Sequence, residues 1–296
     1  MDKSGASLVF LKKRPRICDK MHNNSVKQND RRNNECQKLS RSARYWMDKT
    51  EFRAERAGAL ISGLKGLEET DQSLEVARAA ARRLNSVEPN EVVIQPYDRT
   101  RDLTVSALKS PNGPNYRLYR GSVGLQPITP GSPSEAGMAI DQAVHMPNEP
   151  DCISEPEELT IEIEMLGVTV LGHTDGSAFE KPVEIKSVST MTPQIRFDDF
   201  NQRNRSPFWQ LKGYMMQISM YQLATESNGF LVLVARDTGA VVCFEVDYRH
   251  AMRTLVYEFK NWLEENTGGF RTSIEAYKRG ADYRENWSGE RERVLG

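Results

Sequence analysis

The stretch Gly172–Lys186, GHTDGSAFEKPVEIK, decides both the fold and the chemistry expected of this chain. An apolar run precedes Asp175, so we expect this residue to lie at the edge of a β-strand. A second strand follows at Val183–Lys186, and because side chains alternate along a strand, Glu184 and Lys186 share one face. Two carboxylates and an ammonium group would then meet at the open end of a hairpin. Such an arrangement suits a divalent cation and a general base.

The composition is that of an ordinary globular chain. Its 296 residues carry a formal net charge of −1, with 27 % charged and 38 % hydrophobic residues, which is enough to build a core. No run of about 18 apolar residues occurs, so we expect no membrane span. The first residues have their basic side chains after a short apolar piece, the reverse of a secretory signal. The four cysteines include no CxxC pair, which argues against a disulfide framework or zinc knuckle and favours a cytoplasmic location.

Residues 1–44 form a basic tail in an otherwise nearly neutral chain. They hold twelve Lys or Arg residues against four Asp or Glu, a balance of +8. Their polar composition and lack of periodicity favour a disordered, solvated tail. The alternative is an arm that binds nucleic-acid phosphates.

Residues 45–133 are expected to form a helical and irregular N-terminal region. The strongest helix pattern runs over 71–84, with a cap at Thr70 or the residue after it. Short strands are expected at 92–94 and 103–105, between turns rich in proline and glycine. Three arginines share one side of the helix and face either DNA or solvent: Arg78, Arg82 and Arg83.

The rest of the chain predicts an α/β fold, in which helices flank a central mixed sheet. We expect strands at 159–166, 168–174 and 183–188 to pair as an antiparallel meander that carries the acidic site, with a turn around Glu180. The other expected elements are a helix at 134–146 capped by Ser134, a helix at 208–225, strands at 230–235 and 241–246 joined by a hairpin turn at 237–239, and a helix at 249–266.

These motifs, in this order, resemble the PD-(D/E)XK nuclease superfamily, and within it the RecB-like, phage-type exonuclease branch. Asp175 followed by Glu184-Ile185-Lys186 is similar to the D…ExK signature. Gln217 and Tyr221 match the QxxxY motif on the helix that follows. The resemblance covers about 134–265 and implies a restriction-endonuclease-like core over 134–270, with a charged C-terminal tail at 271–296.

The resemblance also implies a DNA phosphodiester hydrolase that uses Mg²⁺ or Mn²⁺. Asp175, Glu184 and the carbonyl group of Ile185 would supply hard oxygen ligands. The cation would activate a water molecule and stabilise negative charge on the phosphate. Lys186 would orient that water or offset charge on the phosphate.

Further residues would complete the site on the substrate side. Gln217 would hold the attacking water or the substrate end, and Tyr221 would stack on a base or bond a phosphate. The two share a helix face because they are four residues apart. The polar segment 190–206 carries three arginines that we expect to bind substrate: Arg196, Arg203 and Arg205.

The chain departs from the family pattern on the first core helix. RecB-like members often have a GxxxH motif there whose histidine binds metal, whereas here Gly137 is followed by Asp141, with His145 one turn later. Asp141 either coordinates the metal or faces solvent. Glu135 is a weaker candidate, and His173 is expected to be structural. Only one cysteine lies downstream of the motif, inside a predicted strand, so no iron–sulfur cluster is expected.

Three functions remain open on the sequence. The first is a DNA exonuclease in recombination, repair or phage DNA processing, acting in the cytoplasm. Its partner would be DNA, alone or together with a phage or host recombination protein such as a single-strand annealing protein. The second is an endonuclease or nickase of the same fold. The third is a non-catalytic nucleic-acid-binding module, against which the intact set of Asp175, Glu184 and Lys186 argues.

Overall fold

The computed structural model describes residues 37–56, 66–94, 97–99, 103–108, 124–126, 128–146, 151–188, 208–265 and 274. Its elements, in chain order, are β1 Gln37–Lys38, α1 Arg41–Lys49, β2 Arg53–Ala54, β3 Leu67–Glu68, α2 Asp71–Ser86, β4 Val93–Ile94, β5 Tyr97–Arg99, α3 Val105–Leu108, β6 Gly124–Gln126, α5 Pro133–His145, β7 Glu158–Ile163, β8 Val168–His173, β9 Ser177–Ala178, β10 Lys181–Val188, α7 Phe208–Thr225, β11 Gly229–Ala235, β12 Ala240–Val246 and α8 Tyr248–Glu265.

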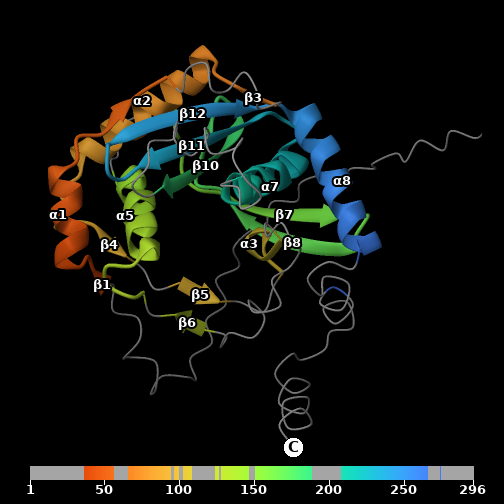
Figure 1. The fold of residues 1–296 in the computed structure, drawn as a ribbon, viewed down its shortest axis with the longest axis horizontal. Helices are drawn as coiled ribbons and strands as arrows, with labels where there is room; N and C mark the ends of the chain where they lie inside the picture. Colours follow the sequence, from red (N-terminus) through yellow and green to blue (C-terminus); the bar gives the residue numbers. More distant parts are fainter. Residues whose placement is uncertain are drawn as a thin grey trace, which may run out of the picture.

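A curled mixed sheet forms the centre of the molecule, with helices on both faces (Figure 1). Six strands take part, in the order β2-β12-β11-β10-β9, with β3 also paired to β12. Strands β10 and β11 are parallel, because α7 lies between them in the chain and carries it back to the same end of the sheet. Strands β11 and β12 form the antiparallel hairpin expected from the sequence. The fold is therefore the expected mixed α/β arrangement.

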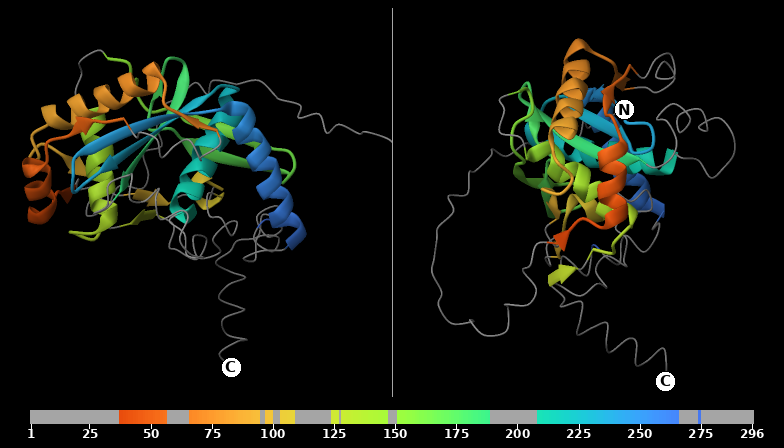
Figure 2. Two further views of the ribbon diagram at one scale, coloured as in Figure 1. Left: turned by 45° about the horizontal axis from the view of Figure 1, so that its top comes forward. Right: turned by 90° about the vertical axis from the view of Figure 1, so that its left-hand side faces the viewer.

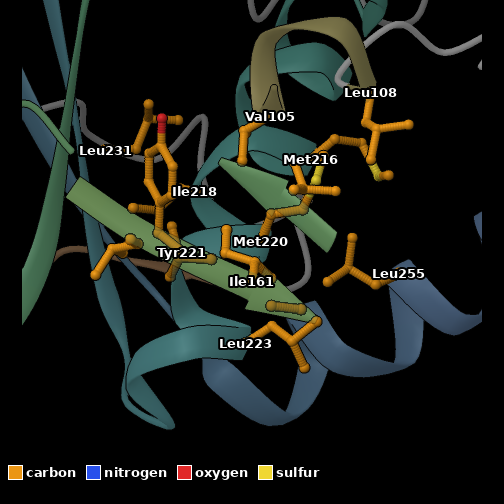
Figure 3. Packing of buried hydrophobic residues seen from close by; sticks show 14 of the residues in the cluster. Val105, Leu108, Ile161, Met216, Ile218, Met220, Tyr221, Leu223, Leu231 and Leu255 are labelled. Carbon is orange, nitrogen blue, oxygen red and sulfur yellow. The ribbon is translucent and has the colours of Figure 1, made fainter. Parts of the chain in front are cut away.

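Two hydrophobic cores lie on opposite faces of this sheet. Successive residues of β11 alternate between them, which explains why the whole strand is apolar and buried. One face packs against α7, α8 and the β7–β8 hairpin, where Figure 3 shows Tyr221, Ile218 and Met220 of α7 among Ile161 and Leu255. The other face packs against α2 and α5. Strand β10 takes part in both, since it places Val183 and Ile185 in the second core and Val188 in the first.

The described N-terminal residues share this sheet and these cores. Helix α2 lies across β12 and β11 (Figure 2), while β2 and β3 pair directly with β12. The expected cap of α2 is confirmed: the Thr70 hydroxyl accepts the backbone N–H of Ser73 in a capping box. The described parts of 45–133 and 134–270 thus belong to one folded unit.

The expected three-strand meander is wrong in its pairing. Strands β7 and β8 pair only with each other, in a two-stranded sheet of their own, and β10 pairs with β11 and β9. The chain bends away after β8, and only residues 175 and 176 keep backbone hydrogen bonds to Val183. The turn before β10 lies at Phe179–Glu180, both with positive φ, and this tight turn leaves room for the short strand β9.

Two local expectations also differ from the structure. The expected strand at 103–105 is instead a single bridge, from Thr104 to Leu171, that leads into the short helix α3. Helix α5 begins at Pro133 and is capped by Ser132 rather than by Ser134, because proline at the first helical position has no N–H that needs a partner. The expected bounds of α7 are confirmed, and α8 begins and ends one residue earlier than expected, with Leu255 and Trp262 buried. No described helix is both long and apolar enough to cross a membrane.

Candidate active site

The candidate site lies at the open edge of β10, where β9 has ended. Strand β9 pairs only with Lys181 and Pro182. Beyond them Val183 bonds the backbone of residues 175 and 176, with N···O distances of 3.0 and 2.9 Å. The next edge donor, the N–H of Ile185, donates to Oδ2 of Asp175 at 2.6 Å. Asp175 therefore takes the place of a neighbouring strand, and its carboxylate is fixed against β10.

Glu184 and Lys186 project from the same face of β10, as the alternation predicts. The Lys186 ammonium contacts Oε1 of Glu184, lies 3.7 Å from Oδ2 of Asp175 and donates to the Ile185 carbonyl oxygen at 3.2 Å. Glu184 is fully buried, and among the described residues neither of its carboxylate oxygens has a hydrogen-bond partner apart from Lys186. The structure thus brings together the Asp, Glu and Lys side chains predicted from the sequence.

Helix α5 adds Asp141 and His145 on the other side of Asp175. Loss of hydration and the nearby negative charge of Asp175 raise the pKa of Asp141 to about 7, and the positive charge of Lys186 partly offsets this. His145 Nε2 lies 3.7 Å from Oδ1 of Asp141, and burial lowers the pKa of the imidazole.

His145 was not predicted to be a site residue, although its four-residue spacing from Asp141 on a helix was a usable signal. An added Cβ at Gly176, the residue after Asp175, would lie 3.8 Å from Cε1 of His145, which places this part of α5 beside the site. Of the two alternatives for Asp141, the structure therefore favours a position at the site, with 42 % of its side chain still exposed.

Gln217 and Tyr221 reach the site from α7, but the tyrosine ring is enclosed. Tyr221 is 1 % exposed, donates its hydroxyl proton to the His173 carbonyl oxygen at 2.7 Å and accepts from Nε2 of Gln217 at 3.0 Å. A base has no access to the faces of this ring, so the expected stacking on a base is wrong. Burial and the charge of Asp175 raise the pKa of Tyr221 well above its ordinary value. Its hydroxyl group instead fixes the end of β8, two residues before Asp175.

The two other candidates, Glu135 and His173, make contacts outside the site. Glu135 accepts hydrogen bonds from the backbone N–H and hydroxyl of Ser40 at 2.6 and 2.8 Å and from the N–H of Gly131 at 2.5 Å, so its carboxylate is fully used away from the site. The side chain of His173 is 67 % exposed and lies 3.8 Å from Glu158, as expected of a residue outside the site.

The arginines that were expected to face DNA, solvent or substrate differ in where they lie. Arg83 was expected to face DNA or solvent, but it is buried, because its guanidinium group bonds to Asp151 and to two backbone carbonyl groups. Arg78 and Arg82 are exposed on α2. The expected substrate-binding residues lie outside the described part of the chain: Arg196, Arg203 and Arg205.

The residues at the open edge of β10 fit a divalent cation in their chemistry. A fully buried carboxylate whose only partner among the described residues is Lys186 is a hard oxygen donor that gains from a further positive partner. Asp175 and the Ile185 carbonyl group lie next to it, with Asp141 and His145 beyond. Among the described residues, no three His, Cys, Asp or Glu side chains already stand as a complete ligand set. Lys186 lies between the two carboxylates instead.

Comparison of the chain with models of protein families, with curated proteins and with solved structures gives no significant match.

Proposed function

We propose that this protein is a divalent-metal-dependent nuclease with a restriction-endonuclease-like core, and that it hydrolyses DNA phosphodiester bonds. One observation carries the proposal: Asp175, Glu184 and Lys186 converge at an open strand edge, where buried Glu184 has no partner but Lys186 among the described residues. An ordinary exposed ion pair leaves its carboxylate in contact with water, because burial of the charge is unfavourable.

In the proposed mechanism Glu184, Asp175 and the Ile185 carbonyl oxygen would hold Mg²⁺ or Mn²⁺, with Asp141 as an additional oxygen donor. The cation would supply Lewis acidity, which lowers the pKa of water and neutralises phosphate charge. Lys186 would turn from the carboxylates towards the phosphate and offset the charge that develops on it.

The α7 residues would support this chemistry in two ways. Gln217 donates to the Tyr221 hydroxyl group and would orient water or the substrate end. Tyr221 would act as a positioning residue, because its hydroxyl group bonds the chain just before Asp175.

The similarity of the Asp175 motif and of Gln217 and Tyr221 to RecB-like exonucleases favours attack at DNA ends, in recombination, repair or phage DNA processing in the cytoplasm. DNA is then the main partner, and a single-strand annealing protein is the kind of recombination partner expected. An endonuclease or nickase of the same fold would use the same residues on internal bonds.

The test is degradation of end-labelled linear DNA beside closed circular DNA, with Mg²⁺ or Mn²⁺ and with EDTA as control. We expect metal-dependent loss of the linear DNA and survival of the circles. Cleavage of the circles would replace the exonuclease by the endonuclease. Cleavage that persists in Asp175→Ala or Lys186→Ala would contradict the mechanism.

A further inference from the structure

Arg83 of α2 is a buried arginine whose hydrogen-bonding capacity is almost fully used. Its Nε and Nη2 atoms donate to the two carboxylate oxygens of Asp151 at 2.7 and 2.6 Å. Nη1 donates to the Val144 carbonyl oxygen at 2.8 Å and Nη2 to the Ile153 carbonyl oxygen at 2.5 Å. A planar guanidinium group suits this bridging role, because its donors have a fixed fork geometry that an ammonium group lacks.

The first partner of Arg83 is the last turn of α5. Val144 lies directly between the residues that α5 brings to the site, since Asp141 precedes it by three positions and His145 follows it. A bond to the Val144 carbonyl oxygen therefore fixes the end of α5 at the level of the site.

The second partner is the segment 151–157, which runs along the loop that holds Asp175. The N–H of Ser154 donates to the Ser177 carbonyl oxygen at 2.8 Å, and the N–H of Thr174 donates to the Glu157 carbonyl oxygen at 3.0 Å. Gly176 packs so closely that an added Cβ would lie 2.6 Å from the Ser154 carbonyl oxygen. This segment is thus attached to the loop on both sides of Asp175.

We propose that Arg83 is a positioning residue for the cation site, which sets the placement of Asp141 and His145 on α5 relative to Asp175 on its loop. Its hydrogen bonds to described residues go to Asp151 and to the carbonyl groups of Val144 and Ile153, none of them a candidate ligand, so that it acts through the backbone of both segments. The inference rests on the proposed function. Outer residues that orient metal ligands typically change metal affinity by tenfold or more when they are replaced.

The test is the affinity of the full-length protein for Mn²⁺, measured by electron paramagnetic resonance in Arg83→Lys and Asp151→Asn. Lysine keeps the charge but cannot span Asp151 and both carbonyl groups. We expect the Mn²⁺ dissociation constant to rise on the order of tenfold in Arg83→Lys and by a smaller factor in Asp151→Asn. A second readout without metal is the ring-proton resonance of His145, which should shift in both variants while that of His250 does not.

A matched control is Glu245→Gln, which disrupts another largely buried ion pair. Glu245 accepts from Lys181 at 2.6 Å, Asn228 at 2.7 Å and Thr70 at 2.9 Å, and these bonds involve no residue of α5 or of the 151–157 segment. We expect it to lower the melting temperature and leave the Mn²⁺ dissociation constant unchanged. An equal loss of affinity in this control would show a general effect of destabilisation and overturn the proposal.

The remaining outcomes distinguish failure of the positioning role of Arg83 from failure of the proposed cation site. If the wild type binds Mn²⁺ and both Arg83→Lys and Asp151→Asn bind it with unchanged affinity, Arg83 has no positioning role. If Arg83→Lys shows no cooperative melting, the Mn²⁺ affinity of Asp151→Asn alone decides, and an unchanged affinity would overturn the positioning role. Failure of the wild type to bind Mn²⁺ would overturn the cation site of the proposed function itself.

Discussion

Glu184 combines two properties that seldom occur together in a side chain with a purely structural role. It is completely buried, and among the described residues its carboxylate contacts one ammonium group and accepts a hydrogen bond from no other donor. Removal of a carboxylate from water is unfavourable by several kcal/mol unless its oxygens are satisfied. Glu135, equally buried, shows the structural alternative, with three hydrogen bonds from nearby groups. The contrast supports the role proposed for Glu184 in cation binding.

The first prediction concerns Glu135→Gln. Loss of hydration raises the pKa of this carboxyl group, but the bonds from Ser40 and Gly131 outweigh it, so the pKa is lowered overall. Glutamine keeps the shape but loses charge-assisted bonds, each of which is worth about 1.5–3 kcal/mol. We expect the free energy of unfolding at pH 7 to fall by about 2 kcal/mol, as measured by urea denaturation.

The direction of the pKa shift of Glu135 determines how this effect depends on pH. The unfolded carboxyl group titrates near pH 4.3 and the folded one lower. The stabilisation is therefore complete above the unfolded pKa and is lost as the pH falls through the lowered pKa of the folded state. The difference between Glu135→Gln and the wild type should shrink towards pH 3. A difference that is equal at pH 3 and pH 7 would contradict the assignment.

At the residue scale, the sequence predicted the direction in which a side chain points where that direction depends on local periodicity. The alternation of β10 correctly predicted that Glu184 and Lys186 lie together. The surroundings of Glu135 and Arg83 were not predictable, because their partners Ser40 and Asp151 lie 95 and 68 residues away in the chain. Such pairs depend on which elements meet in the folded molecule.

At the scale of elements, the packing of α7 on β8 requires a glycine. An added Cβ at Gly172 would lie 2.7 Å from Cε1 of Tyr221 and 3.0 Å from Val105, both in the buried core. Gly137 in the middle of α5 differs, since its Cβ would lie 3.4 Å from the Ser187 hydroxyl oxygen.

The second prediction compares alanine at these two positions. Gly172→Ala should lower the free energy of unfolding by about 1–3 kcal/mol through overpacking, and should also reduce cleavage because Tyr221 positions the chain before Asp175. Gly137→Ala should raise the free energy of unfolding by about 0.5–1 kcal/mol, because alanine has a higher helix propensity than glycine. Urea denaturation measures both. A stabilising Gly172→Ala would show that the contact between Gly172 and Tyr221 does not constrain the fold.

The elements themselves were easier to predict than their partners. The bounds of α7 and α8 and the β11–β12 hairpin followed from periodicity and from a local turn, where Gly239 has φ +72°. The pairing of β10 with β11 was missed, because a parallel pair is joined through a long helical connection that leaves no local pattern. The short strand β9 pairs with β10 in place of β8, because the tight turn at Phe179–Glu180 brings the residues just before the turn beside β10.

At the scale of the whole molecule, α2 covers one face of the central sheet. Its buried residues contact β12 and β11, while β2 and β3 extend the sheet beyond β12. The sequence motifs of the nuclease resemblance begin only at about residue 134, so they gave no indication of this coverage. Hydrophobic periodicity predicted the helix 71–84 but could not show which surface it would bury.

The third prediction follows from this coverage. A chain shortened to residues 134–296 would expose the sheet face formed by Val232, Val241 and Cys243, which α2 and its neighbours bury in the intact molecule. Because these residues are more than 95 % buried, we expect the shortened chain to lack a cooperative thermal transition in circular dichroism. A cooperative transition like that of the full chain would mean that the N-terminal elements are dispensable for the core.

The measurement that tests the central claim most directly is the rate of linear DNA degradation as a function of Mg²⁺ concentration, in the wild type, Glu184→Gln and Glu245→Gln. We expect cleavage by the wild type that saturates with Mg²⁺ and stops in EDTA, similar cleavage by Glu245→Gln, and a loss of at least a hundredfold in Glu184→Gln, since one ligand of the cation would be replaced. Cleavage by Glu184→Gln at the wild-type rate, or none by a folded wild type at any Mg²⁺ or Mn²⁺ concentration, would contradict the account.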